Sequence, residues 1–527
     1  MQHDVPILTA TESAASDAAA IAAGTPSLEL MRAAGLAAAN EIRRRFGGRL
    51  AEGVFVHAGT GNNGGDGWIV AGALASHGIR VRVASIGEPR TDDARAARES
   101  ALPALAGSTA PGAPSIEPPD PEGVVIDALL GTGARGRPHG LVAEAIVRIR
   151  GARAAGAAVV ALDVPSGLDA TSGDADGAVT ADCTIAFGAL KRGHLLARDR
   201  CGTTVVVDIG TGRADREASV PLLVDREWVA LRIPPIGAAA HKGTRGKLAI
   251  VGGAPGMVGA ALWAARAALR SGIGMVRVWV HPDSVGAAQA AAPEVMAAPW
   301  PETDDAAHAL GAWADAVLLG PGLGTDHAAR DVAARVLHLW RGPVAVDADA
   351  LNIHAGRPGE LGAVLAGRPA LVTPHVAEFA RLAGTSPSDV EARRFDIGLS
   401  LAVTLGATVL LKGVPTVITG ETGQRVVSAA GTPVLATAGS GDLLAGVVST
   451  LLAQSVPAFD AAACGAWLHG RAAERANAGR PVRGVTLDDV VLALAHGWRL
   501  GTADNPDGDP PEWPVLAELP AVGEHAP

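Results

Sequence analysis

The sequence lacks tyrosine altogether and contains only three cysteines and six phenylalanines in 527 residues. Cys183, Cys201 and Cys464 are widely spaced, odd in number and form no CxxC pair, so neither a disulfide framework nor a zinc site is indicated. No run reaches the ~18 apolar residues that span a bilayer. The amino terminus also lacks the basic start and apolar core of a signal peptide. We therefore expect a cytoplasmic protein without a membrane partner.

Positive charge is scarce as well. The formal net charge is −10, and the largest basic cluster is the triplet Arg43 to Arg45, which excludes nucleic-acid or anionic-membrane binding as the main function. We expect small-molecule partners and a homo-oligomer. Among 44 basic residues only four are lysines, namely Lys191, Lys242, Lys247 and Lys412. A lysine kept against such an arginine bias is a candidate for chemistry.

Two series of short apolar runs alternate with helical stretches along the chain, which predicts an α/β protein with parallel sheets buried on both faces. The residues between the two series are rich in charge and proline. We expect a first domain over residues 1–215, a linker over 216–240, a second domain over 241–501 and a disordered tail over 502–527. Each domain is expected to form three α/β/α layers, with ligands at the carboxyl ends of the strands.

A Gly- and Asn-rich segment, HAGTGNNGGDGWIVAGAL, lies between an apolar strand and a helix in the first series. Its glycines either let backbone amides cradle a phosphate or merely form a tight turn. The segment imitates the Rossmann GxGxxG, but Asn62, Asn63 and Asp66 have no role in that fingerprint. A Rossmann oxidoreductase is therefore disfavoured.

Polar residues also end two further strands of this series. Asp127 follows VVI, and Asp163 and Ser166 follow VVAL. A single acid at a strand end is often only a helix cap. Three such groups at the same edge of a sheet indicate a shared crevice.

The motifs GNNGGDG, DALLGTG, LDVPSGLD and FGALKRGH, in this order over about residues 5–215, resemble the NAD(P)H-hydrate epimerase domain. The resemblance implies that Asp163 and Lys191 carry the acid/base chemistry, and that Asn63, Asp127 and Ser166 bind a potassium ion. It implies a site for the hydrated dinucleotides NADHX and NADPHX made of Asn62, Asn63, Gly64, Gly65, Asp66, Gly131, Thr132, Gly133, Ala134, Arg135, Gly136, Arg137 and Asp163.

The strongest feature of the second series is AGSGDLLAGVVSTLLAQ, in which two glycines precede an apolar helix. The amides of residues 439–442 are expected to form an anion hole, with Asp442 beside it as a base for an attacking hydroxyl. Phosphoryl transfer needs both groups together. For GSGD alone, an aspartate cap would be the simpler interpretation.

Other loops of this series add polar groups, and no P-loop GxxxxGK[ST] is present, which excludes a P-loop kinase. His375 is as well explained by a satisfied histidine at a strand end as by a ligand. The residues that follow the remaining strands are Asp347, Asp349, Asn352, His375, Glu378, Lys412, Gly413 and Thr416.

Together HKGTRGKLAIVGG, GPGLG, DADALN, TPH..E, KG..T and GSGD resemble the ribokinase-like fold, and more narrowly its ADP-dependent NAD(P)H-hydrate dehydratase branch, over about residues 225–500. The family usually continues TPH with Pro-Gly-Glu, whereas this chain has Val376, Ala377 and Glu378. The resemblance implies Mg²⁺ with the nucleotide. It implies two sets of residues: Ala260, Gly324, His375 and Asp442 for the hydrate, and Lys412, Gly413, Val414, Pro415, Thr416 and Gly441 for ADP.

The expected function is repair of hydrated NADH and NADPH. The first domain would interconvert the two epimers, and the second would phosphorylate the hydroxyl so that phosphate departs. Two alternatives stay open. The second domain is a kinase for another hydroxylated metabolite in one of them, and the first domain is a binding module without catalysis in the other.

Overall fold

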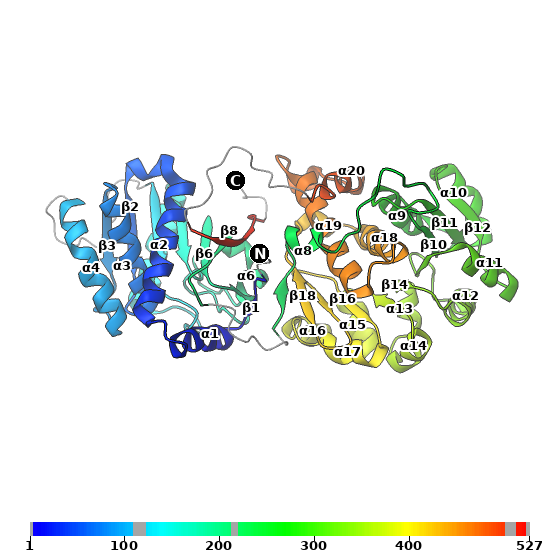
Figure 1. Ribbon diagram of the computed structural model, residues 1–527, viewed down its shortest axis with the longest axis horizontal. Helices are drawn as coiled ribbons and strands as arrows, with labels where there is room; N and C mark the ends of the chain where they lie inside the picture. Colours follow the sequence, from blue (N-terminus) through cyan, green and yellow to red (C-terminus); the bar gives the residue numbers. More distant parts are fainter. Residues whose placement is uncertain (1–3, 109–122, 212–219, 501–512, 523–527) are drawn as a thin grey trace. The chain divides into compact units, whose positions relative to one another are not determined.

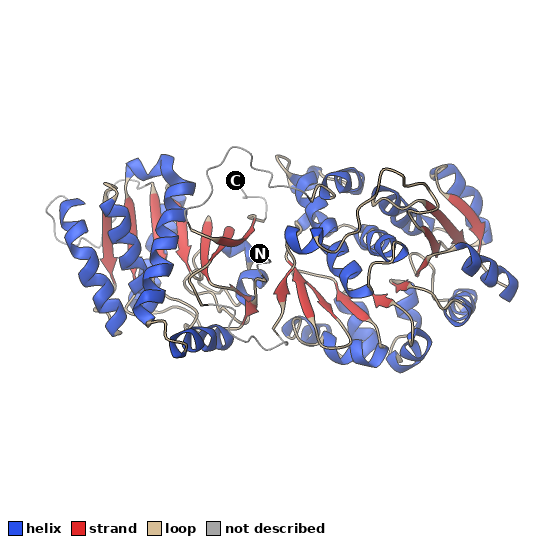
Figure 2. Cartoon of the chain, viewed as in Figure 1, coloured by secondary structure: helices blue, strands red, loops and turns tan. Residues whose placement is uncertain are grey.

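The computed structural model describes residues 4–108, 123–211, 220–500 and 513–522. The chain divides into two compact units, one formed by residues up to Val220 together with the segment after residue 502, and the other by Pro221–Thr502. Helices flank a central sheet in each unit (Figures 1 and 2). No helix within the described residues is long and apolar enough to cross a bilayer.

The first unit contains a seven-stranded sheet in the order β19-β8-β6-β5-β4-β2-β3. All neighbours are parallel except β19, which runs antiparallel to β8. Its strands are β2 (Val54–Ala58), β3 (Val81–Ser85), β4 (Val124–Ala128), β5 (Ala158–Leu162), β6 (Cys183–Phe187), β8 (Thr203–Val207) and β19 (Val515–Leu519), and its helices are α1 (Ala10–Ala22), α2 (Ser27–Phe46), α3 (Asn62–Ser76), α4 (Asp92–Ser108), α5 (Gly140–Ala154), α6 (Arg192–Leu196) and α7 (Arg198–Cys201).

Both faces of this sheet are covered, which explains the unbroken apolar runs. In β4 the side chain of Ile126 packs with helices α2–α4, and the neighbouring Val125 packs with α5. A separate two-stranded parallel sheet joins β1 (Ile7–Leu8) to β7 (Leu190–Lys191). The amino-terminal strand thereby fixes the position of Lys191.

The second unit contains a ten-stranded sheet in the order β12-β11-β10-β13-β14-β15-β16-β17-β18-β9. Its strands are β9 (Leu222–Leu223), β10 (Lys247–Val251), β11 (Met275–Val280), β12 (Met296–Pro299), β13 (Ala316–Leu319), β14 (Val344–Val346), β15 (Ala370–Val372), β16 (Thr408–Leu411), β17 (Thr416–Thr419) and β18 (Arg425–Ser428). The strands from β12 to β16 are parallel, and β17 is antiparallel to both of its neighbours.

Two hydrophobic clusters lie on opposite faces of this second sheet. One contains residues of α8, α9, α10 and α18–α20, and the other contains residues of α11–α17. The helices are α8 (Arg226–Ala230), α9 (Val258–Arg270), α10 (Val285–Ala291), α11 (Asp304–Trp313), α12 (His327–Leu339), α13 (Asp349–Ile353), α14 (Pro358–Leu365), α15 (Val376–Ala383), α16 (Pro387–Ala392), α17 (Gly398–Leu405), α18 (Ser440–Ala453), α19 (Ala458–Asn477) and α20 (Leu487–Gly497). The prediction of α/β layers is confirmed for both units.

Two predicted boundaries are wrong. Part of the expected linker belongs to the second unit, because β9 pairs with β18 and the buried Trp228 and Val229 of α8 join its core. The expected tail over 502–527 contains β19, whose pairing with β8 provides the backbone hydrogen bonds that an isolated segment lacks. Proline and acidic residues around this short apolar strand hid it from an argument based on composition. Residues 212–219, 501–512 and 523–527 lie outside the described part of the chain.

Candidate active sites

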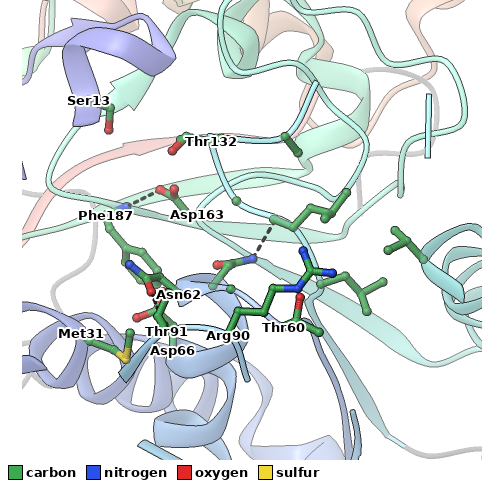
Figure 3. A pocket seen from close by; sticks show the side chains of 18 of the residues that line it. Ser13, Met31, Thr60, Asn62, Asp66, Arg90, Thr91, Thr132, Asp163 and Phe187 are labelled. Carbon is green, nitrogen blue, oxygen red and sulfur yellow. Dashed lines mark hydrogen bonds between the residues drawn. The ribbon is translucent and has the colours of Figure 1, made fainter. Parts of the chain in front are cut away.

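A cavity of about 970 Å³ opens at the carboxyl ends of the strands of the first unit. The loops after β2, β3, β4, β5 and β6 line it, together with residues of α1 and α2. Figure 3 shows side chains from these separate segments turned toward one space. Such a position and volume suit a large ligand, because open α/β sheets bind ligands at this edge.

The glycine-rich loop between β2 and α3 is packed too closely for side chains. A Cβ on Gly59 would lie 1.8 Å from the Leu129 carbonyl oxygen, and one on Gly64 would lie 2.0 Å from the Gly59 carbonyl oxygen. A tight turn therefore explains these two glycines. The same turn puts Asn62 and Asn63 in the first turn of α3, at the cavity wall. Phosphate binding at this helix start stays a prediction.

Asn63 lines the cavity, and Asp127 and Ser166 lie behind the lining; Asn63 and Ser166 both bond to the backbone of Leu130. The Ser166 amide donates to Asp127 Oδ2 at 2.8 Å and its hydroxyl donates to Oδ1 at 2.5 Å. Asn63 Nδ2 donates to the Leu130 carbonyl at 2.8 Å, while its buried Oδ1 has no hydrogen-bond partner among the described residues. Burial raises the pKa of Asp127 to about 6 despite the bonds from Ser166. The cluster thus holds an unsatisfied amide oxygen beside a fully buried carboxylate.

Asp163 and Lys191 form an ion pair at the cavity wall. The Lys191 ammonium also donates to the Phe187 carbonyl at 3.0 Å and to that of Ala189 at 3.3 Å. Asp163 has φ +61°, a left-handed conformation that is unfavourable for a non-glycine residue. His194 holds it there, because its Nε2 lies 2.8 Å from the Asp163 carbonyl oxygen.

His194 connects the backbones of Lys191 and Asp163 through an uncharged ring. Its Nδ1 accepts from the Lys191 amide at 3.1 Å, which leaves Nε2 as the donor to Asp163. Burial, and next the charge of Lys191, lower the pKa of His194 to about 4. The ring is therefore uncharged near neutral pH. His194 stands in the FGALKRGH motif, but nothing in the sequence indicated that it would support the aspartate backbone.

Two further acids line the cavity near this pair. Burial, and next the charge of Asp163, raise the pKa of Asp66 well above its usual range. Burial also raises the pKa of Asp17, partly offset by the charge of Lys191. Asp17 escaped the sequence analysis, because one acid in an Ala-rich helix has no distinguishing pattern. The cavity therefore holds, close to an ion pair, a carboxyl group whose surroundings favour the protonated form.

The predicted site residues of the first unit separate into two groups. Those that line the cavity are Asn62, Asn63, Asp66, Gly131, Thr132, Gly133, Ala134, Arg135, Gly136, Arg137, Asp163 and Lys191. Gly64, Gly65, Asp127 and Ser166 lie outside the lining. Gly65 packs under Met31, since a Cβ there would lie 2.6 Å from its sulfur atom. The first group can touch a ligand, and the second shapes the wall behind it.

In the second unit α18 begins at Ser440, after Gly439 in a left-handed conformation with φ +94°. The hydrogen-bond ladder starts with the Leu443 amide and the Gly439 carbonyl at 3.1 Å, so the amides of Gly441 and Asp442 precede it. Burial, and next the charge of Asp347, raise the pKa of Asp442 to about 7. The arrangement combines free amides at a helix start with a carboxylate that titrates near neutrality.

Lys412 follows β16, and its ammonium group lies near residues that follow β14, β15 and β18. Its Nζ lies 2.8 Å from Asp347 Oδ1 and 3.8 Å from Glu378 Oε2. A Cβ on Gly441 would lie 3.3 Å from the same nitrogen. Burial alone lowers the pKa of Lys412, but the charges of Asp347 and Glu378 outweigh burial and raise it. The structure thus brings this lysine to the start of α18.

The loop from Lys412 to Thr416 is shaped by Arg394. Arg394 Nη1 donates to the carbonyls of Lys412 and Pro415, both at 3.3 Å. A Cβ on Gly413 would lie 2.3 Å from that nitrogen, and its φ of +149° favours glycine at this position. Val414 is exposed. Arg394 is a supporting residue that sequence patterns did not indicate, because it lies in the turn between α16 and α17, outside every motif.

The residues predicted for the hydrate come from four segments of this unit, namely α9, the loop after β13, the N-cap of α15 and the start of α18. The Gly324 amide donates to Asp349 Oδ2 at 2.9 Å, and Ala260 lies in α9. His375 caps α15, with Nδ1 accepting from the amides of Ala377 and Glu378. Glu378 Oε2 in turn accepts from the His375 amide at 2.8 Å. A capping box therefore explains both residues, and the departure from Pro-Gly-Glu keeps it intact.

Two family models match separate regions of the chain. A family model described as NAD(P)H-hydrate dehydratase matches residues 248–495, and one described as YjeF-related protein N-terminus matches residues 27–193. The solved structure of the ADP/ATP-dependent NAD(P)H-hydrate dehydratase from Bacillus subtilis, co-crystallised with ATP/Mg²⁺, is 27% identical with a TM-score of 0.47, covering 53% of this chain and 98% of that one.

Curated relatives match across both units. The bifunctional NAD(P)H-hydrate repair enzyme Nnr of Moorella thermoacetica is 35% identical over 497 residues, which is 89% of this chain and 92% of the relative. The enzyme of the same name from Escherichia coli is 35% identical over 473 residues, 88% of each chain. This chain therefore belongs to the family of bifunctional NAD(P)H-hydrate repair enzymes.

Proposed function

We propose that the first unit interconverts the R and S epimers of NADHX and NADPHX, and that the second unit dehydrates the S epimer to NADH or NADPH. The second reaction consumes ADP and releases AMP and phosphate. The observation that carries the proposal is the presence of two separate acid/base arrangements, Asp163 with Lys191 and Asp442 with Lys412, each beside a helix start.

The proposed epimerisation acts on a hemiaminal carbon, C6 of the hydrated ring. Its configuration inverts if the hydroxyl leaves and water returns, or if the ring opens and recloses, and both routes move one proton to and from oxygen. Asp163 and Lys191 are positioned to exchange that proton. The raised pKa of Asp66 favours the protonated form, in which the carboxyl group can donate a hydrogen bond to the substrate.

We also propose that Asn63, Asp127 and Ser166 hold a potassium ion. The unsatisfied Asn63 Oδ1 and the buried Asp127 carboxylate supply hard oxygen donors, and no lysine or arginine contacts that carboxylate among the described residues. A bound monovalent cation would neutralise Asp127 and fix the loop that carries Leu130. The ion would also help to hold phosphate groups of the dinucleotide.

In the proposed dehydration Asp442 takes the proton of the C6 hydroxyl as its oxygen attacks the β-phosphorus of ADP. The new O–P bond forms while the bond to the AMP oxygen breaks. The ring nitrogen lone pair then expels phosphate, and loss of a C5 proton restores the double bond. Phosphoryl transfer makes the elimination possible, because hydroxide is a poor leaving group and phosphate is a good one. A pKa near 7 suits Asp442 to this role.

Lys412 and the amides of Gly441 and Asp442 would bind the nucleotide phosphates, with residues 413–416 around the nucleotide. The carboxylates of Asp347, Asp349 and Glu378 gather near Asp442, since all three raise its pKa. This donor set fits Mg²⁺, which takes few carboxylates together with phosphate oxygens. When bound, Mg²⁺ would neutralise charge on the transferring phosphoryl group.

Product analysis of the full chain with mixed epimers tests the proposal. With ADP, all of the hydrate should return to reduced dinucleotide, and phosphate should be released in equal amount. Repair of half of the mixture would remove the epimerase assignment. A stable phosphorylated product would instead identify a kinase. The predicted cytoplasmic location and homo-oligomer remain proposals, to be checked by fractionation and by light scattering.

A further inference from the structure

The charged side chains that line the first-unit cavity fall into two groups, a cluster of acids around Lys191 and a set of arginines with Asp93. The acids Asp17, Asp66 and Asp163 lie with Lys191, as their mutual effects on pKa require. Arginines come from two other loops and are exposed. Figure 3 draws Arg90 next to Thr60 and away from Asp163. A ligand with a reactive ring at one end and phosphates at the other would match this separation.

The backbone of Arg90 is fixed to the glycine-rich loop. Its amide donates to the Thr60 carbonyl at 2.8 Å, and its carbonyl accepts from Arg95 Nη1 at 3.2 Å. The next residue, Thr91, donates through its hydroxyl to Asn62 Oδ1 at 2.7 Å. The loop after β3 is therefore held against the start of α3.

The Arg90 guanidinium has no hydrogen bond or ion pair with any described residue. Its neighbours along the chain differ, since Arg95 pairs with Asp92 and Arg98 with Glu88. In the loop after β4, Arg137 Nε lies 3.7 Å from Asp176 Oδ2. Asp93 also lines the cavity, without an ion pair to Arg90. The backbone of Arg90 is therefore fixed at the cavity wall, and the N–H groups of its guanidinium are available to a ligand.

The topology indicates which part of a dinucleotide Arg90 would meet. β2, the glycine-rich loop, α3 and β3 form a βαβ unit, and β3 is parallel and adjacent to β2. In dinucleotide-binding βαβ units the phosphates sit at the helix start, and the residue after the second strand meets the adenosine ribose. An acid there accepts the 2′-hydroxyl, whereas an arginine accommodates a 2′-phosphate. Here that loop presents Arg90, and its acid Glu88 is already paired with Arg98.

We propose that Arg90 binds the ribose 2′-phosphate and makes the first unit prefer NADPHX to NADHX. The inference rests on the proposed epimerase function and extends it to substrate choice. A guanidinium can donate two parallel hydrogen bonds to a phosphate, and such charged bonds are about twice as strong as neutral ones. The preference arises in binding, because the 2′-phosphate is remote from the reacting C6.

Steady-state kinetics of the full chain with purified R epimers test this assignment. Arg90→Gln should lower kcat/KM for R-NADPHX about tenfold or more, mainly through KM, and leave R-NADHX nearly unchanged. Arg90→Lys should keep part of the preference for R-NADPHX, since lysine retains the positive charge but lacks the two parallel N–H donors of the guanidinium. Arg80→Gln, at the opposite end of β3, removes the same charge and should alter neither substrate. Unchanged turnover of R-NADHX by the same variant serves as the control that the first unit is folded.

Equal losses for both substrates, or no loss for R-NADPHX, would overturn the role of Arg90 while leaving the epimerase assignment intact. Failure of the unaltered chain to convert either R epimer would overturn both. A binding measurement gives a readout independent of turnover. Calorimetry should show that Arg90→Gln weakens NADP⁺ binding to the full chain more than NAD⁺ binding, and equal weakening would count against the proposal.

Discussion

Lys191 and Asp163 form an ion pair in which the lysine side chain is 1% exposed and the aspartate side chain is 14% exposed. The ammonium is therefore enclosed by protein, while the carboxylate keeps access to the cavity. Two backbone carbonyls complete the coordination of the lysine. Removing one partner of such a pair leaves a buried charge uncompensated. The pair is consequently tied both to the stability of the first unit and to its proposed chemistry.

Replacing Lys191 by methionine should abolish epimerisation and destabilise the first unit. We expect kcat/KM for the R epimers to fall by at least about 10²-fold, because proton transfer by a placed group contributes that much. The unpaired Asp163 should lower the free energy of unfolding by about 3 kcal/mol. Chromatographic assay of the R epimers and denaturant titration measure the two effects.

The double variant Lys191→Met/Asp163→Asn separates stability from catalysis. It removes both charges, so it should recover much of the lost stability without recovering epimerisation. ADP-driven dehydration of the S epimers should stay normal in both variants. Restored epimerisation in the double variant would rule out a role for these side chains in proton exchange.

The pH dependence of dehydration should report Asp442. Its pKa is raised to about 7, and only the carboxylate form can accept the hydroxyl proton. kcat/KM for the S epimers should therefore increase with pH up to about 7 and then level off. Asp442→Asn should reduce kcat by about 10²–10⁴-fold and remove this inflexion. A profile that is unchanged in Asp442→Asn would assign the titration to another group.

Potassium should support the first unit more than the second. Replacing potassium chloride by choline chloride should slow epimerisation and lower the unfolding temperature of the first unit, because the buried Asp127 carboxylate loses its counter-charge. The Asp127→Asn variant should epimerise the hydrate slowly in both salts. If the unaltered chain performed equally well in choline, the Asn63–Asp127–Ser166 cluster would be structural only.

Removing the carboxyl-terminal strand β19 should lower the local stability of the first-unit sheet at β8. β19 covers the edge of β8, Arg45 pairs with Glu518 at 2.6 Å, and Arg198 Nη2 donates to the Pro520 carbonyl at 2.6 Å. Truncation before Trp513 should increase hydrogen exchange in β8 without affecting β10. Glu518→Gln is the matched control and should change stability by less than about 1 kcal/mol. Unaltered exchange in β8 would contradict a stabilising role for β19.

Sequence patterns predicted the layers and many of the residues that line the first-unit cavity. Apolar runs ending in Asp or Gly located β4 and β5, and the motifs assigned Asp163, Lys191 and Asp442 their positions. They did not predict Asp17 or Arg394, because each acts through contacts with residues distant in the chain. They also predicted a disordered tail where β19 lies, since an edge strand is defined by its partner and not by its own composition.

The amino-acid sequence by itself determined the α/β class, the two series of strands and the chemical identity of the groups at their carboxyl ends, because alternation and glycine spacing are local properties. Tertiary structure alone decided which charges meet. Burial pushes Asp66 toward the protonated form and Asp442 toward a pKa near 7, and it leaves Asn63 Oδ1 without a hydrogen-bond partner among the described residues. The physical reason is that desolvation and Coulomb interactions depend on distances between segments, which sequence order does not contain.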